Sequence, residues 1–170
     1  MEFKELARKR YSCRNLSSEK IDSNLIESII ESAILAPTAV NKQPFKIFVM
    51  ESESAVSKVK EVTKCIFGAE TFLVLGYKSE DAWVREFDNH NFGEVDASIV
   101  GTHIMLEISD LGLETTWVGH FDAPKLKELC PEMRDYELIA IFPIGYPDKD
   151  AKPSERHFIR KEKNELVEKL

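Results

Sequence analysis

The chain has 170 residues, 43% of them hydrophobic, and a formal net charge of -7. A chain of this size can bury one substantial core, so we expect a single domain over residues 1–170. The acidic balance argues against a nucleic-acid surface, which needs clustered Lys and Arg to neutralise phosphates. No apolar run approaches the roughly 20 residues that span a bilayer, and the first residues lack the apolar segment of a signal peptide. These features predict a cytoplasmic protein that binds neither nucleic acid nor membrane.

Cysteine and histidine spacing gives no sign of a disulfide framework or a metal site. Cys13, Cys65 and Cys130 are an odd number at wide spacing, without any CxxC pair. The four histidines also lack metal-motif spacing. We therefore expect reduced thiols and no metal.

The first half of the chain alternates helical and strand patterns. Asp22 is a suitable N-cap, and Ile21 and Ile26 are placed as a hydrophobic staple, so a helix is predicted to begin there and to end at Pro37. After a loop bracketed by two prolines, "PFKIFVM" predicts a strand. A short helix around 54–64 and a fully buried strand, "TFLVLGY", follow.

The longest predicted helix, residues 94–113, has almost no polar stripe. A helix that is apolar nearly all round must be buried nearly all round, either at the centre of the fold or against a partner subunit. Its small residues Ala97, Ser98 and Gly101 would let another helix approach closely. We therefore expect a homodimer interface here, and Gly112 is well placed as the residue that follows the helix C-cap.

The remaining elements complete a layered pattern. "ETTWVGHF" predicts a short strand or extended turn, "APKLKELC" a helix, and "ELIAIFPIGY" another buried strand. We expect the Pro-rich polar tail to end in a short helix. Alternating helices and strands indicate an α/β or α+β domain.

A basic cluster near the N-terminus, "RKRYSCRNL", stands out in this acidic chain. Arg10 and Arg14 lie four residues apart, so in a helical turn both guanidiniums would project to one side, with the Ser12 hydroxyl nearby. Such a group suits a phosphate. Alternatively, Arg8 and Lys9 together with Arg10 complement the dipole at a helix C-terminus. Composition alone leaves the two interpretations even.

A second polar segment is the loop "APTAVNKQPF". Thr38, Asn41 and Gln43 supply hydroxyl and carboxamide groups that match the hydrogen-bonding pattern of a flat heterocycle, although such a loop is also ordinary connecting structure. Standard catalytic signatures are missing from the sequence. The chemistry is therefore either binding alone or is carried by a cofactor.

Taken in order, "RYSCR", "ILAPTAVNKQPFKIFVM", "ISDLGLETTWVG" and "IFPIGYPDKDAKPSER" resemble the nitroreductase family of FMN-dependent oxidoreductases in its short form, over roughly residues 4–156. The resemblance implies an α+β class with three α/β/α layers, a mixed, mainly antiparallel sheet, and an intertwined homodimer with FMN at the subunit interface. It also implies the following cofactor-binding residues: Arg10, Tyr11, Ser12, Arg14, Pro37, Thr38, Ala39, Asn41, Gln43, Thr116, Trp117, Val118, Gly119 and Arg156.

The family resemblance implies a reaction in two halves. NADH or NADPH delivers a hydride to the flavin, and a small electron-poor acceptor such as a nitroaromatic or a quinone is then reduced, with no catalytic side chain required. Alternatives that keep the fold and FMN are reductive dehalogenation, oxidation of a biosynthetic intermediate, and flavin storage without turnover.

Several positions depart from the family pattern or need separate assignment. Phe45 replaces a common Trp, and Lys152 is the nearest candidate for a second basic residue before Arg156. Trp83 and Phe87 either line the substrate pocket or anchor their loop. Cys13 lies among arginines that would favour its thiolate, but no nearby base or second cysteine supports a catalytic role.

Overall fold

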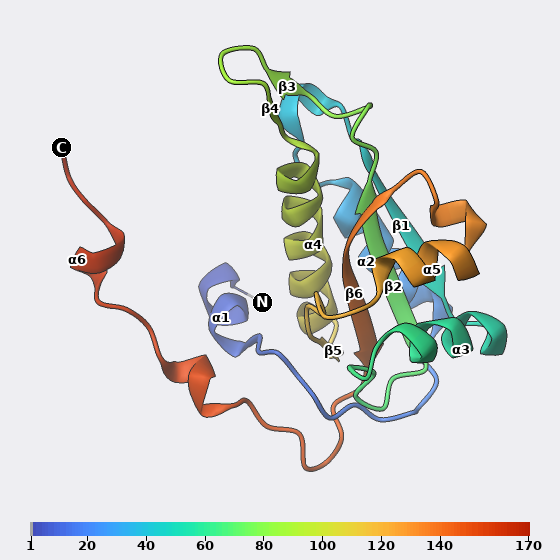
Figure 1. The fold of residues 1–170 in the computed structure, drawn as a ribbon. Coiled ribbons are helices and arrows are strands. Elements are labelled where there is room, and N and C mark those ends of the chain that lie inside the picture. The colour runs from blue at the N-terminus through green and yellow to red at the C-terminus, as the bar shows by residue number, and fades with distance from the viewer. Residues whose placement is uncertain (1) are drawn as a thin grey trace.

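A computed structural model describes residues 2–170 and is built around one antiparallel sheet (Figure 1). The strand order is β1-β2-β6-β5, so β2 and β6 are the central strands. Phe45 lies opposite Tyr77 across β1 and β2, and Thr71 lies opposite Ile144 across β2 and β6. A parallel bridge between Ser12 and Thr115 makes the sheet mixed. The strands are β1 Phe45–Met50, β2 Thr71–Tyr77, β5 Glu114–Thr115 and β6 Glu137–Gly145, with a separate hairpin of β3 Val84–Arg85 and β4 His90–Asn91.

The helices agree with the predicted ranges to within a few residues. They are α1 Phe3–Lys9, α2 Ser23–Ile34, α3 Glu53–Val62, α4 Gly93–Asp110, α5 Ala123–Leu129 and α6 Lys163–Leu166, together with short 3-10 turns at Ala39–Asn41, Pro131–Met133 and Glu155–Phe158. The Asp22 carboxylate accepts from the Asn24 N–H at 2.9 Å, and Ile21 and Ile26 are both buried, so the predicted start of α2 is confirmed. Its last helical residue is Ile34, three residues before the predicted stop.

Two hydrophobic cores lie on opposite faces of the sheet, which confirms the predicted three layers. Leu73 and Leu75 of β2 pack with α2 and α4, whereas Phe72 and Val74 of the same strand pack with α3 and α5. The alternation follows from the pleat, which turns successive side chains to opposite faces. It explains why "TFLVLGY" reads as a continuous apolar run.

The C-terminal end of α4 is a Schellman motif, as Gly112 predicted. The Leu113 N–H donates to the Ile108 carbonyl at 3.0 Å, and the Gly112 N–H donates to the Ser109 carbonyl at 3.3 Å. Gly112 has φ +80°, the left-handed conformation that glycine adopts without a Cβ penalty. The motif turns the chain directly into β5.

One side of α4 is open in the single chain, and the homodimer interface expected on this helix stays a prediction. Ala97, Val100 and Ile104 are fully buried against the sheet and α2. Val95 is 41% exposed, and Thr102 is exposed on the same helix. A single chain therefore covers one face of α4 and leaves apolar surface on another.

After β6 the chain stays in contact with the N-terminal segment, because Pro147 bridges to Leu16 and His157 Nε2 lies 3.2 Å from the Arg8 carbonyl. Its last part then extends away from the folded body, with α6 near its end (Figure 1). Phe158 and Ile159 are 72% and 69% exposed, and every residue from 158 to 170 is exposed. Within residues 2–170, no helix combines the length and apolar character needed to cross a membrane.

Candidate cofactor-binding site

The segment from Arg10 to Arg14, which contains the first predicted cofactor contacts, is extended rather than helical. α1 ends at Lys9, and Arg10 has φ -55° and ψ 128°. Beyond it, Ser12 bridges to Thr115, and the Cys13 N–H donates to the Thr115 carbonyl at 3.0 Å. The segment is therefore not the helical turn considered for Arg10 and Arg14, because Thr115 gives it backbone partners. In an extended chain alternate residues face one side, so Arg10, Ser12 and Arg14 still share a side.

The other side of this segment faces the core. The Cys13 side chain is fully buried, and its thiol donates to the Asn15 carbonyl at 3.3 Å. Tyr11 packs against the same core, and burial is the main reason that its pKa is raised above the usual range, followed by its hydrogen bond to Cys13. Both side chains hold the segment in place, which fits the expected bystander role of Cys13.

Two arginines from distant parts of the chain line one pocket. Arg14 and Arg156 share a cavity of about 430 Å³ with Ser154 and Glu155, and Lys152 is not part of its lining. Arg14 Nη1 donates to the Ser12 carbonyl at 3.2 Å, which orients the guanidinium. Two guanidiniums and a hydroxyl are a suitable donor set for a phosphate, which accepts charge-assisted hydrogen bonds from both. Both arginines are among the cofactor-binding residues that the family resemblance implies, and the fold places them in one pocket.

The segment Thr116–Gly119 forms a fixed platform beside the sheet. Val118 exchanges two backbone hydrogen bonds with Ile141, at 3.0 and 2.9 Å. The Trp117 ring meets Phe142 edge to face with centroids 5.2 Å apart, and it lies so close to α4 that a Cβ on Gly101 would be 2.4 Å from it. At the end of the segment, Gly119 is exposed, and a Cβ there would touch nothing within 4 Å.

Glu114 is a buried acid beside the basic segment that the sequence did not single out. Glu114 is 7% exposed, and burial raises the pKa of its carboxyl to about 7. The nearby charges of Lys9 and Arg10 lower this pKa but do not cancel the effect of burial. In the sequence, the feature that could have identified Glu114 is that it is a single acid in the largely apolar stretch "LGLETTWV". Its charge state affects the potential around Arg10.

The loop between Pro37 and Pro44 is held in an unusual backbone conformation. Val40, Asn41 and Gln43 have φ values of 45°, 57° and 50°, in the left-handed region. Each costs a non-glycine residue about 1–2 kcal/mol, and such strain tends to collect at functional sites. The Gln43 N–H donates to Thr38 Oγ1 at 3.0 Å, and Gln43 Nε2 donates to the Asn41 carbonyl at 3.2 Å. The predicted polar groups therefore form one organised loop.

This loop is attached to the first turn of α4. The Ala39 N–H donates to Asp96 Oδ1 at 2.8 Å, and Asp96 is 1% exposed. Sequence reasoning missed Asp96. The feature that could have identified it in the sequence is an acid at a position where the helix pattern is otherwise apolar.

The two halves of the predicted site lie at opposite ends of α4. The Arg10–Arg14 side joins Thr115, which follows the C-terminal end of the helix, whereas Pro37–Gln43 joins Asp96 in its first turn. α4 has 18 residues, a length of about 27 Å. Figure 1 shows β5 at one end of this helix and the β3–β4 hairpin, which leads into it, at the other. Within one chain, the Arg14–Arg156 pocket and the Thr116–Gly119 platform therefore lie at the same end of α4, whereas the loop 37–43 lies at the other end.

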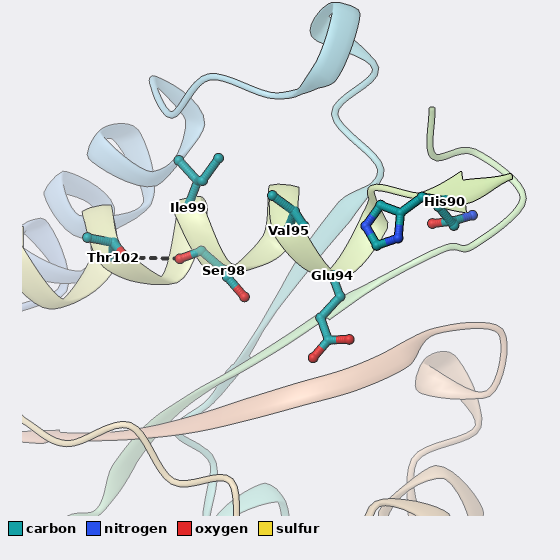
Figure 2. Close-up of a pocket in the computed structure, with 7 residues that line it drawn as sticks. His90, Glu94, Val95, Ser98, Ile99 and Thr102 are labelled. Carbon is teal, nitrogen blue, oxygen red and sulfur yellow. Dashed lines mark hydrogen bonds between the residues drawn. The ribbon is translucent and has the colours of Figure 1, made fainter. Parts of the chain in front are cut away.

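A further cavity of about 450 Å³ lies against the open side of α4 (Figure 2). None of the predicted cofactor residues lines it, because it is formed by His90, Asn91, Glu94, Val95, Ser98, Ile99 and Thr102. In the preceding hairpin Trp83 packs on Phe92 at 5.0 Å, whereas Phe87 is 97% exposed. Trp83 thus anchors the loop and Phe87 does not. Within residues 2–170, no cluster of three or more His, Cys, Asp or Glu side chains could hold a metal ion.

Comparisons with known proteins identify the family and the fold. The model of the nitroreductase family matches residues 7–67 and 59–146. A crystal structure of a nitroreductase family protein from Clostridium difficile 630 is 32% identical, with a TM-score of 0.91 over 99% of this chain and 98% of that one. A proposed nitroreductase from Exiguobacterium sibiricum, solved in complex with FMN, is 19% identical, with a TM-score of 0.85 over 100% of this chain and 98% of that one.

Two curated relatives have different functional names. A proposed NADH dehydrogenase/NAD(P)H nitroreductase of Archaeoglobus fulgidus is 27% identical over 84% of this chain and 83% of its own length. Iodotyrosine deiodinase 1 of Mus musculus is 23% identical over 88% of this chain and 64% of its own length. The chain thus spans less than two thirds of the length of this mouse protein.

Proposed function

Because the chain belongs to the nitroreductase family, we propose that it is an FMN-dependent oxidoreductase that uses NADH or NADPH to reduce nitroaromatics, quinones or related electron-poor acceptors, working as a homodimer. The observation that carries the proposal is the pocket shared by Arg14 and Arg156. Residues 142 positions apart in the sequence (156 minus 14) converge on a place suited to one anionic group.

The residues present fit FMN. Arg14 and Arg156 would hold its phosphate, since their guanidiniums are the charge-assisted donors in the pocket. The Thr116–Gly119 platform would lie along the ring, where the open space at Gly119 leaves room for a ligand. The FMN complex of the Exiguobacterium sibiricum protein, which has the same fold, supports this choice of cofactor.

A second copy of the chain would complete each site. The loop with Thr38, Asn41 and Gln43 lies a helix length away from Arg14 in its own chain, so we assign it to the flavin bound by the partner subunit. The open apolar side of α4 and the extended tail supply surface for such a dimer. Val95 and Ile99 would then be covered by the partner.

FMN, when bound, supplies the redox chemistry by accepting a hydride and passing reducing equivalents to the acceptor. The chain's own residues bind the phosphate, orient the ring on the platform, and keep water from the covered side. Arg10 adds positive potential beside the site, which stabilises negative charge there. No side chain is required as an acid or a base, so all the proposed site residues are binding residues.

Anaerobic reduction tests the proposal. The purified protein should bind FMN, bleach rapidly when NADH or NADPH is added, and regain its flavin absorption when a nitroaromatic is added. A protein without FMN affinity would contradict the proposal. Binding without bleaching would support a flavin-storing dimer instead.

Reductive dehalogenation is the second candidate function. It is favoured by the similarity to iodotyrosine deiodinases over 88% of this chain. The flavin site would look alike, so only substrate turnover separates the two. Release of iodide from an iodinated tyrosine by the reduced protein, without turnover of nitroaromatics, would favour this alternative.

A further inference from the structure

Asp96 is a buried carboxylate without an assigned role. It is 1% exposed, and Oδ1 accepts from the Ala39 N–H at 2.8 Å, while Oδ2 is fully buried with no hydrogen-bond partner among residues 2–170. A buried charged group with an unused acceptor is costly in a fold. The position in the first turn of α4 offsets part of this cost, because the helix dipole favours negative charge there.

The hydrogen bond from Ala39 to Asp96 satisfies a backbone N–H at the start of the loop. Thr38 occupies the N-cap position of the Ala39–Asn41 turn, but its side chain makes no cap bond because it accepts from the Gln43 N–H instead. Ala39 is the first residue of this turn, so its N–H has no partner within the turn and needs an acceptor from elsewhere in the fold. Asp96 fixes the start of the loop, and Thr38 fixes its end.

These two contacts act on a strained segment. Val40 is β-branched, and with Asn41 and Gln43 it is held at positive φ. A non-glycine backbone leaves this region unless its surroundings hold it there. Loss of the Asp96 contact would let the segment relax and would move the Asn41 and Gln43 side chains.

We propose that Asp96 is a positioning residue, which presets the backbone of the loop 38–43 so that Thr38, Asn41 and Gln43 can contact FMN. The inference rests on the proposed function, because it concerns the same cofactor. Asp96 acts through the Ala39 N–H and does not itself touch the flavin. Preorganisation of this kind raises affinity because the loop does not have to be ordered on binding.

FMN affinity, measured by the change in flavin fluorescence on binding, tests the proposal in four chains. Asp96→Ala should bind FMN about 10- to 100-fold more weakly than the wild type, as expected for loss of one charge-assisted hydrogen bond. Asp96→Asn keeps an acceptor for Ala39 and should fall between the two. Ser109→Ala is the matched control, since Ser109 is also buried on α4 with an unpartnered side-chain oxygen but does not contact the loop. Its affinity should stay within about twofold of the wild type.

Amide hydrogen exchange of the FMN-free protein separates positioning from general destabilisation. In Asp96→Ala the amides of residues 39–43 should exchange faster, while the central strands β2 and β6 keep their protection. If Asp96→Ala does not fold, Asp96→Asn carries both measurements.

Three outcomes would overturn the proposal. Wild-type affinity in a folded Asp96→Ala or Asp96→Asn chain would remove Asp96 from the site. Equal weakening in Ser109→Ala, or exchange that rises throughout the fold, would show a structural role only. A wild-type chain that binds no FMN would refute the proposed function and this inference together, and that result is distinct because no variant is needed to obtain it.

Discussion

Single side chains in this protein carry roles that depend on their burial. Glu114 and Asp96 are both acids in apolar surroundings, but Asp96 accepts a hydrogen bond from a backbone N–H, whereas Glu114 lies buried near Lys9 and Arg10. Arg14 is exposed and oriented by the Ser12 carbonyl. The family resemblance named both Arg14 and Arg156, and the structure shows that they line one pocket.

Replacement of Glu114 by Gln should change how stability depends on pH. The unfolded carboxyl ionises near pH 4.5, whereas the folded one keeps its proton until about pH 7. Between these values the folded state binds more protons, so its stability falls as pH rises. Over this window the wild type should lose about 1–2 kcal/mol relative to Glu114→Gln, less than the full linkage value because some solvent reaches the group.

Urea unfolding at a series of pH values measures this difference. The exposed Glu128→Gln is the control and should leave the pH profile unchanged. A wild-type profile parallel to that of Glu114→Gln from pH 4.5 to 7 would contradict the raised pKa.

Replacement of Arg14 by Ala should weaken FMN binding by about 1.5–3 kcal/mol, the range for a hydrogen bond to a charged group. Titration of FMN into the cofactor-free protein measures it. Lys152→Ala is the control, because Lys152 does not line the Arg14–Arg156 pocket. Unchanged affinity in Arg14→Ala, or an equal loss in Lys152→Ala, would move the phosphate away from this pocket.

At the scale of elements, α4 organises the site. Its first turn holds the polar loop through Asp96, its middle receives Trp117 against Gly101, and its C-terminal end turns the chain into β5, where Thr115 meets Ser12. The Schellman motif at Gly112 sets the direction of that last turn.

Two glycines provide a matched test of that turn. A Cβ on Gly112 or on Gly119 would meet nothing within 4 Å, but only Gly112 has a positive φ, of +80°. Gly112→Ala should therefore lower the free energy of unfolding by about 1 kcal/mol through backbone strain alone. Gly119→Ala should be close to neutral for stability. Urea unfolding of both variants checks this, and equal effects would exclude backbone strain as the cause.

For the whole molecule, the separation of the two site halves by a helix length is the dominant feature. Each chain carries the Arg14–Arg156 pocket at one end of α4 and an organised polar loop at the other. The proposed homodimer would pair them twice, once for each flavin.

Mixed dimers of Arg14→Ala and Asp96→Ala chains test this pairing. If the loop serves the partner's flavin, both defects fall on one site of the mixed dimer and the other site is intact. At an FMN concentration that saturates the wild type but neither variant, we expect one FMN for each mixed dimer and two for each wild-type dimer. Differently tagged chains purified in tandem provide the sample.

The opposite result has a clear signature. If each loop serves its own chain, both sites carry one defect, and the mixed dimer binds no FMN at that concentration. Failure of the tagged chains to copurify would contradict the homodimer itself.

The sequence by itself determined most of the elements, because their signals are local. The cap at Asp22, the staple of Ile21 and Ile26, the run "TFLVLGY" and Gly112 each act through contacts within a few residues or one strand. The family and the fold class also followed from ordered motifs, and both are confirmed.

Only the tertiary structure decided what depends on contacts between distant parts of the chain. The stretch "RYSCR" is extended because Thr115 pairs with it, whereas local charge spacing suggested a helical turn. The role of Asp96 depends on its contact with Ala39, which no sequence pattern predicted, and the structure adds that Arg14 and Arg156 line the same pocket. The open side of α4 likewise reflects which surfaces one chain can cover. All of these features have the same physical reason. Backbone pairing, burial and the proximity of charges depend on which residues are neighbours in three dimensions, and spacing along the sequence does not specify those neighbours.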